Sequence, residues 1–179
     1  MTDVYLGLGS NLNRHANISA ALDALSEAFG EIRVSRVFES EAVGCTASNY
    51  FNLAVAVKTD LPLAELSSWL KRLEDSFGRI RRGKPVEQPL DIDILIYGDR
   101  VGSFDGVQLP RAEILRNAFV LWPLAELVPD ALHPAEKQTF ARLWQAYSSD
   151  QQLWPIHFDW HDRAISVPDN TGFSAQQGG

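Results

Sequence analysis

Two aspartates and a group of basic residues just before them are the part of this chain best suited to chemistry. Asp91 and Asp93 stand one residue apart in the apolar run PLDIDILIYG. On a β-strand, residues i and i+2 point to the same face about 7 Å apart, so the two carboxylates can hold a hard cation such as Mg²⁺ together with substrate phosphates. Four basic side chains lie within six positions: Arg79, Arg81, Arg82 and Lys84.

Each half of this pattern also has a simpler interpretation. Paired aspartates at a strand end can be exposed charges, and a charged loop is most often solvated. Together they favour a phosphate–metal site, because adjacent carboxylates repel each other and cations beside them offset that repulsion. Pro85 and Pro89 bracket a segment with little apolar content, which predicts a surface loop able to close over a ligand.

The composition limits the classes of protein to which this chain can belong. With 179 residues, 45% of them hydrophobic, the chain is long and apolar enough for one domain with a sizeable core. We expect that domain to span residues 1–163 and a disordered tail to span 164–179, where hydrophobic periodicity is lost. A net charge of −7 argues against a nucleic-acid binder, but a local basic loop can still serve a small anionic ligand.

Three further features concern the compartment. No run approaches the roughly 18 consecutive apolar residues of a membrane helix, and the N-terminal MTDVYLGLGSN lacks the pattern of a secretory signal. The single cysteine, Cys45, cannot form an internal disulfide, which fits a reducing compartment. We expect a cytoplasmic monomer that takes small-molecule substrates and has neither nucleic acid nor membrane as a partner.

Hydrophobic spacing predicts the elements that position the aspartates. Helical periodicity indicates one helix over about residues 15–29 and a second one capped by Asp60. Strand patterns cover residues 4–11, 31–40, 50–59 and 91–98. The resulting order β-α-β-β-α-β is the split βαβ pattern. We therefore predict an α+β fold, with a ferredoxin-like βαββαβ core and a C-terminal α/β extension.

Other motifs offer less chemistry. Gly7 and Gly9 follow a strand, but a dinucleotide fingerprint needs a third glycine where Leu12 stands, and a tight turn at the strand end explains Gly9. His157 and His161 have i, i+4 spacing, yet a zinc site needs further ligands nearby.

The remaining histidines, the cysteine and the tryptophans indicate no site. His15 and His133 are expected at the surface, and Cys45 has no visible base partner that would make it a nucleophile. Trp122 and Trp144 are expected in the core.

Four motifs in order resemble one known family. The segments YLGLGSNL, YFNLAVAV, GRIR…PLDIDILIYGD and FVLWPLAELVPD, between about Val4 and Pro129, are similar to those of 6-hydroxymethyl-7,8-dihydropterin pyrophosphokinases of the folate pathway. Members of this family move a pyrophosphoryl group from ATP to the pterin hydroxymethyl oxygen and release AMP. Attack is at the β-phosphorus, and two Mg²⁺ ions neutralise the phosphate chain. The resemblance therefore implies a Mg²⁺-dependent ATP pyrophosphokinase.

The resemblance also implies roles for particular residues. It makes Arg79, Asp91 and Asp93 catalytic, with both aspartates as metal ligands. The residues it assigns to ATP are Glu74 and Arg81, with Arg82, Lys84, Arg111 and Arg116 as replacements for contacts that family members make elsewhere. The residues it assigns to the pterin are Asn11, Ser40, Val43, Tyr50, Asn52 and Phe119.

The nucleotide half departs from the family pattern. The loop lacks the family's tryptophan, Gln88 and Asn117 stand where arginines are usual, and Arg111 replaces a histidine. In one interpretation, neighbouring cations take over and the enzyme is active. The alternative is a divergent relative that binds a pterin or nucleotide and transfers slowly or not at all. Retention of both aspartates favours the active enzyme, whereas an RNA-binding module is disfavoured by the acidic charge and the missing aromatic strand pattern.

Overall fold

The structure is a computed structural model that describes residues 1–41, 48–78 and 87–169. Its strands are β1 (Thr2–Ser10), β2 (Arg33–Val34), β3 (Phe38–Ser40), β4 (Tyr50–Thr59), β5 (Asp91–Tyr97), β6 (Gly102–Phe104), β7 (Val107–Leu109), β8 (Leu153–Pro155), β9 (Phe158–Trp160) and β10 (Arg163–Ser166). Its helices are α1 (Arg14–Phe29), α2 (Leu63–Ser76), the 3-10 helix η1 (Ala112–Leu115), α3 (Ala118–Leu127) and α4 (Phe140–Ala146).

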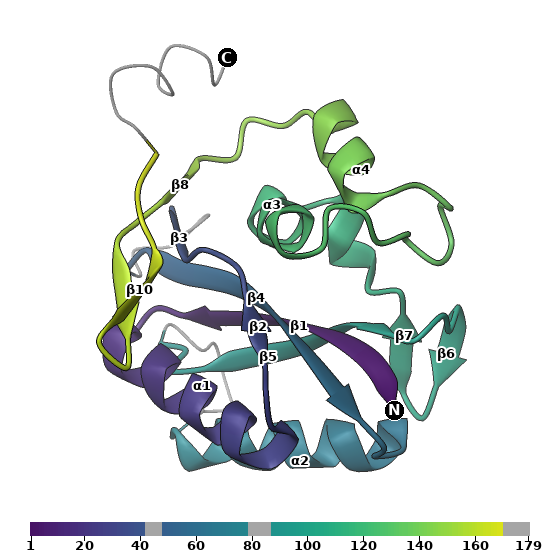
Figure 1. Ribbon diagram of the computed structural model, residues 1–179, viewed down its shortest axis with the longest axis horizontal. Helices are drawn as coiled ribbons and strands as arrows, with labels where there is room; N and C mark the ends of the chain where they lie inside the picture. Colours follow the sequence, from purple (N-terminus) through teal and green to yellow (C-terminus); the bar gives the residue numbers. More distant parts are fainter. Residues whose placement is uncertain (42–47, 79–86, 170–179) are drawn as a thin grey trace.

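One antiparallel sheet forms the centre of the molecule. Its strand order is β5-β1-β4-β3-β8, with β2 also paired to β4. In the chain the elements run β1, α1, β2 and β3, β4, α2, β5. The prediction of an α+β fold with a ferredoxin-like βαββαβ core is confirmed, and the extension adds helices and the edge strand β8. Helices α1 and α2 cover one face of the sheet and α3 covers the other (Figure 1).

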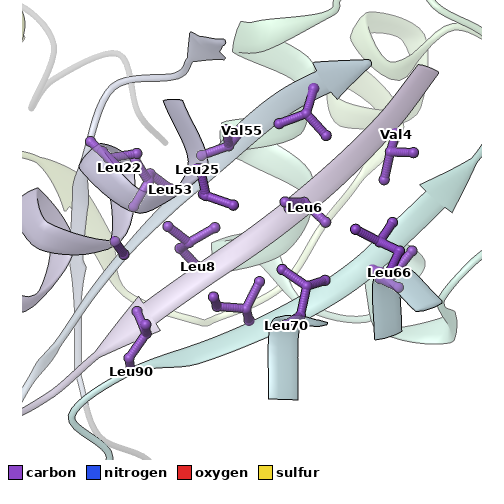
Figure 2. Packing of buried hydrophobic residues seen from close by; sticks show 14 of the residues in the cluster. Val4, Leu6, Leu8, Leu22, Leu25, Leu53, Val55, Leu66, Leu70 and Leu90 are labelled. Atoms are coloured by element: carbon purple, nitrogen blue, oxygen red, sulfur yellow. The ribbon is translucent and has the colours of Figure 1, made fainter. Parts of the chain in front are cut away.

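The face under α1 and α2 is the larger core. Alternate residues of β1 point there, among them Leu6 and Leu8, and both are almost fully buried. They pack with leucines of both helices, such as Leu22 and Leu66 (Figure 2). Burying one such side chain contributes roughly 1.5–3 kcal/mol, so this layer fixes how β1 and its neighbours lie.

A bulge in β5 changes which residues of the strand point toward α3. The pairing of β1 with β5 shifts between Tyr5 and Leu6, so that Leu95 is the extra residue. Leu95 and Ile96 consequently both pack on the α3 side, in the cluster that includes Phe140. The bulge lies just beyond the aspartates and leaves them in regular pairing with β1.

The α3 face carries an aromatic stack. Trp122 of α3 lies between Phe38 of β3 and Trp144 of α4, with ring centroids 4.6 Å and 5.2 Å apart. Tyr147 continues the stack, 5.7 Å from Trp144. Phe38 is fully buried, whereas Trp122, Trp144 and Tyr147 are half-buried. The stack joins the extension to the sheet.

The predictions made for Asp60 and His133 are wrong. The second helix begins at Leu63 after Pro62, and Asp60 does not cap it. His133 is buried, and its Nδ1 accepts hydrogen bonds from the N–H groups of Ala135 and Glu136, which closes a turn. Burial also lowers the pKa of His133.

The predicted disordered tail is wrong for residues 164–169. Strand β10 extends to Ser166, which is buried and whose Oγ accepts from Val37 N at 2.9 Å. Asp169 Oδ1 accepts from Arg36 at 2.8 Å. Hydrophobic periodicity cannot reveal polar contacts of this kind, which explains the error. Residues 170–179 lie outside the described part of the chain. Among the described residues, none of the helices has the length and apolar character needed to cross a membrane.

Candidate active site

A cavity of about 320 Å³ lies on the α3 face of the sheet. Its floor comes from β1, β4 and β5, and its walls come from β3 and from the start of α3. The residues that line it include Gly7, Gly9, Ser40, Glu41, Tyr50, Asn52, Gln88, Asp91, Asp93, Arg111, Glu113, Asn117 and Phe119.

Two glycines of β1 make room for this cavity. Gly9 pairs with Asn52 on one side and with Asp91 on the other, and Gly7 pairs with Asp93. Since glycine has no side chain, the neighbouring strands can project theirs over β1. A Cβ atom on Gly9 would lie 3.1 Å from Asn52 Oδ1, closer than ordinary packing allows. Both glycines lie inside the strand, so the prediction of a turn at Gly9 is wrong.

Asp91 and Asp93 project from β5 on the cavity face, as their spacing predicts. Both also line a second cavity of about 260 Å³, which Lys71 and Glu74 of α2 border. The aspartates therefore stand between a space under α3 and a space beside α2.

The surroundings of Asp93 are strongly acidic. Burial, followed by the negative charge of Asp91, raises the pKa of Asp93 to about 7, and the carboxylates of Glu74 and Glu113 act in the same direction. Arg111 opposes them, with Nη2 3.4 Å from Asp93 Oδ1. A divalent cation would offset this excess of negative charge, and two carboxylates on one face suit Mg²⁺. The residues present thus fit the predicted metal.

Arg111 is shared between two carboxylates. Its Nε lies 2.9 Å from Glu113 Oε2, an ion pair without the alignment of a hydrogen bond. Its backbone N–H donates to Leu95 O at 2.9 Å, which anchors the residue to the outer edge of β5. This placement puts a guanidinium beside Asp93, where it can also contact an anionic ligand.

Glu74 supports the strand that carries the aspartates. Its carboxylate is buried, and Oε2 accepts a hydrogen bond from Ile92 N at 2.7 Å. Ile92 lies between the two aspartates, and its N–H points away from β1 at the sheet edge. The resemblance assigned Glu74 to ATP, and the structure gives it this backbone contact at the border of the second cavity.

Polar and aromatic groups meet at the other end of the cavity. Asn52 Nδ2 donates to Ser40 Oγ at 2.8 Å, and both side chains are buried. Tyr50 Oη donates to Gln88 Oε1 at 2.6 Å. Phe119, the second residue of α3, completes the lining. Amides, hydroxyls and flat rings of this kind suit a planar heterocycle with a hydrogen-bonding edge.

Some assigned residues lie elsewhere. Asn11 is outside the cavity lining and binds the backbone of Gln88 instead: its N–H donates to Gln88 O, and its Oδ1 accepts from Gln88 N at 2.6 Å. Arg116 is exposed and pairs with Glu113 at 3.4 Å. Five residues with a predicted role lie outside the described part of the chain: Arg79, Arg81, Arg82 and Lys84 of the basic loop, and Val43, predicted to bind the pterin.

Two acidic residues of the lining were not predicted from the sequence. Glu41 and Glu113 border the cavity, and only the position of Glu113 two residues after Arg111 offered a signal. His157 and His161, considered for zinc, turn to Asp159 and Asp23 respectively. Within the described residues, no three His, Cys, Asp or Glu side chains are grouped so that they could hold a metal ion.

Sequence comparison places residues 5–129 in a known family model, described as 7,8-dihydro-6-hydroxymethylpterin-pyrophosphokinase. A curated relative from Aquifex aeolicus, named 2-amino-4-hydroxy-6-hydroxymethyldihydropteridine pyrophosphokinase, is 36% identical over 136 residues, which is 75% of this chain and 85% of the relative. A relative of the same name from Pseudomonas aeruginosa is 35% identical over 136 residues, 73% of this chain and 83% of its own.

Solved structures agree on the fold. A Plasmodium falciparum HPPK-DHPS structure with pteroate matches 93% of this chain with a TM-score of 0.66 at 16% identity. The chain spans 48% of that longer protein. At this identity the likeness concerns the fold alone.

Proposed function

The chain belongs to the 7,8-dihydro-6-hydroxymethylpterin-pyrophosphokinase family, and we propose that it transfers pyrophosphate from ATP to 6-hydroxymethyl-7,8-dihydropterin. The products are the pterin diphosphate and AMP, as a step of folate biosynthesis. The observation that carries the proposal is the position of Asp91 and Asp93, which border both a ring-sized polar cavity and a second cavity beside α2.

We propose that Asp91 and Asp93 hold two Mg²⁺ ions together with the phosphate chain. When bound, Mg²⁺ neutralises phosphate charge and aligns the chain for attack. The raised pKa of Asp93, which burial and the neighbouring carboxylates cause, supports this assignment. A carboxylate surrounded by like charges gains more from a cation than an isolated one does.

The pterin would lie between Phe119 and the polar end of the cavity. Asn52 and Ser40 already bond to each other, so they present fixed dipoles to the edge of the ring. Tyr50 and Gln88 form the adjoining wall. In this position the hydroxymethyl group would face β5, where the aspartates would align the phosphates, and the enclosing walls exclude water.

Arg111 would contact the phosphates beside the aspartates. Its guanidinium already forms ion pairs with Asp93 and Glu113. A phosphate chain in the cavity would bind the guanidinium more strongly than these carboxylates do. The roles of Arg79, Arg81, Arg82 and Lys84 remain those that the resemblance implies.

A second candidate is a relative that binds pterin and transfers slowly or not at all. The observation in its favour is electrostatic: among the described residues that line the main cavity, Arg111 is the one cation beside the carboxylates Glu41, Asp91, Asp93 and Glu113. Losing one cation that acts in the transition state typically costs about 10² to 10⁵ in rate.

An AMP-release assay with ATP, Mg²⁺ and hydroxymethyldihydropterin separates the two candidates. We expect AMP to form in proportion to added pterin, and Asp91→Asn to abolish it while calorimetry still detects pterin binding. The matched control is Asp99→Asn, which changes an exposed carboxylate just after β5. Pterin binding without AMP release would establish the second candidate.

We also propose that the protein works in the cytoplasm as a monomer on small molecules. The single cysteine supports a reducing compartment. Gel filtration of the purified chain with light scattering tests the monomer, and a mass of twice 19.9 kDa would contradict it.

A further inference from the structure

A glutamine beyond the family-matched residues holds the end of α3 that faces the cavity. Gln151 Oε1 accepts a hydrogen bond from Ala118 N, at the first position of α3, at 2.6 Å. Gln151 Nε2 donates to Oδ1 of the N-cap residue Asn117 at 3.2 Å. The side chain of Asn117 itself makes no capping hydrogen bond to the helix. Gln151 therefore supplies an acceptor that the first turn of the helix needs.

The segment that carries Gln151 also binds the opposite wall of the cavity. Two residues further on, Leu153 begins β8 and pairs with Ser40 of β3. Ser40 lines the cavity from β3, and Phe119 lines it from α3. One short stretch, residues 151–155, thus contacts both walls, although these walls come from distant parts of the chain.

The position of Phe119 depends on the first turn of α3, because Phe119 directly follows Ala118. The polar wall has its own internal support, the hydrogen bond from Asn52 to Ser40. If the first turn of α3 loosened, Phe119 would move relative to a wall that stays fixed. A ligand held between the two would lose contact area and the fit of its ring.

We propose that Gln151 is a positioning residue for the pterin substrate: it fixes the first turn of α3, and thereby Phe119, against the wall that Ser40 and Asn52 form. This inference rests on the proposed function, since it takes the cavity as the pterin site. The aspartates lie on β5 and are supported by Glu74 of α2, and Arg111 is anchored to β5 through Leu95 O, so the nucleotide contacts have supports of their own besides Gln151.

Three variants of the full chain test the proposal. Gln151→Ala removes both hydrogen bonds. Gln151→Glu keeps an acceptor for Ala118 N, next to the positive end of the helix dipole, and a flipped Asn117 amide can donate to it. The matched control is Gln152→Ala, which removes an exposed amide that donates to Asp150 O.

Each variant is measured by equilibrium fluorescence titration with hydroxymethylpterin, by KM and kcat in the AMP-release assay, and by thermal unfolding. We expect Gln151→Ala to raise the pterin Kd and KM about fivefold, the loss of roughly one hydrogen bond. The KM for ATP should stay unchanged, Gln151→Glu should restore pterin affinity, and Gln152→Ala should match the wild type.

Two results would overturn the proposal: unchanged pterin affinity in Gln151→Ala, or equal weakening of pterin and ATP binding, which indicates general loss of structure. Failure of the proposed function is distinguishable from both. A wild-type protein that binds pterin without releasing AMP refutes the transfer reaction, while the titrations still decide the role of Gln151. A wild-type protein that does not bind pterin refutes both.

Discussion

Replacing Asp93 by asparagine should make the protein more stable and inactive at the same time. Burial and the charge of Asp91 raise the pKa of Asp93 to about 7, from an ordinary value of 3.8. Ionising such a carboxyl in the folded protein would cost up to about 4 kcal/mol. Its side chain is 33% exposed, so water screens part of this cost, and we expect Asp93→Asn to gain about 1–2 kcal/mol at pH 8.

The pH dependence of this gain follows from the direction of the pKa shift. Below about pH 4 the carboxyl is protonated in both the folded and the unfolded chain, so it imposes no penalty. Between about pH 4 and pH 7 the folded protein keeps a proton that the unfolded chain releases, and wild-type stability falls as the pH rises. Above about pH 7 the penalty is constant. The two proteins should therefore be nearly equal at pH 4 and differ most at pH 8.

Urea unfolding in EDTA at pH 4, 6 and 8 measures the difference in free energy of unfolding. Asp99→Asn is the control, because it removes an exposed carboxylate of the same segment and should show no such pH-dependent gain. Adding Mg²⁺ at pH 8 should stabilise the wild type more than Asp93→Asn, since a ligand stabilises the state that binds it. An asparagine variant that is no more stable than wild type at pH 8, or a gain that does not change with pH, would refute the reasoning.

Three further substitutions probe the supports of the site. Glu74→Ala should lower the free energy of unfolding by about 1–3 kcal/mol, because Ile92 N loses its buried acceptor; urea unfolding measures this, and Glu74→Gln should recover part of the loss. Gly9→Ala should weaken pterin binding in fluorescence titrations, since the new Cβ would lie 3.1 Å from Asn52 Oδ1; unchanged affinity would show that Asn52 can move aside. Phe140→Ala should cost about 3–5 kcal/mol, because its ring is fully buried between α4 and the sheet, with a correspondingly lower Tm by calorimetry.

The site could be predicted in part because some of it is local in sequence. Asp91 and Asp93 had to share a face once β5 was a strand, and the structure places them so. Tyr50 and Asn52, which line the cavity, share a face of β4 for the same reason. Phe119 lies almost 70 positions further along the chain. That it meets Tyr50 and Asn52 in one cavity was implied by the resemblance and could not be derived from spacing.

Two contacts in the site could not be predicted, because a residue type does not say which partner the fold will bring to it. Asn11 is a polar residue of the first motif, and its partner is the backbone of Gln88. Glu74 is an acid near the nucleotide side, yet its carboxylate binds a backbone N–H of β5. In both cases the partner is a main-chain group of a segment that is distant in sequence, and every residue carries such groups.

The sequence by itself determined the order of elements and the faces of the sheet, because alternation and helical spacing are local properties of the chain. It also determined which strand carries the carboxylates. Only the tertiary structure decided that the glycines of β1 would open the cavity floor, that Asp91, Glu74 and Glu113 would act together to raise the pKa of Asp93, and that Gln151 would bind the start of α3. Each of these depends on register and packing between distant segments, where one step of register changes every neighbour.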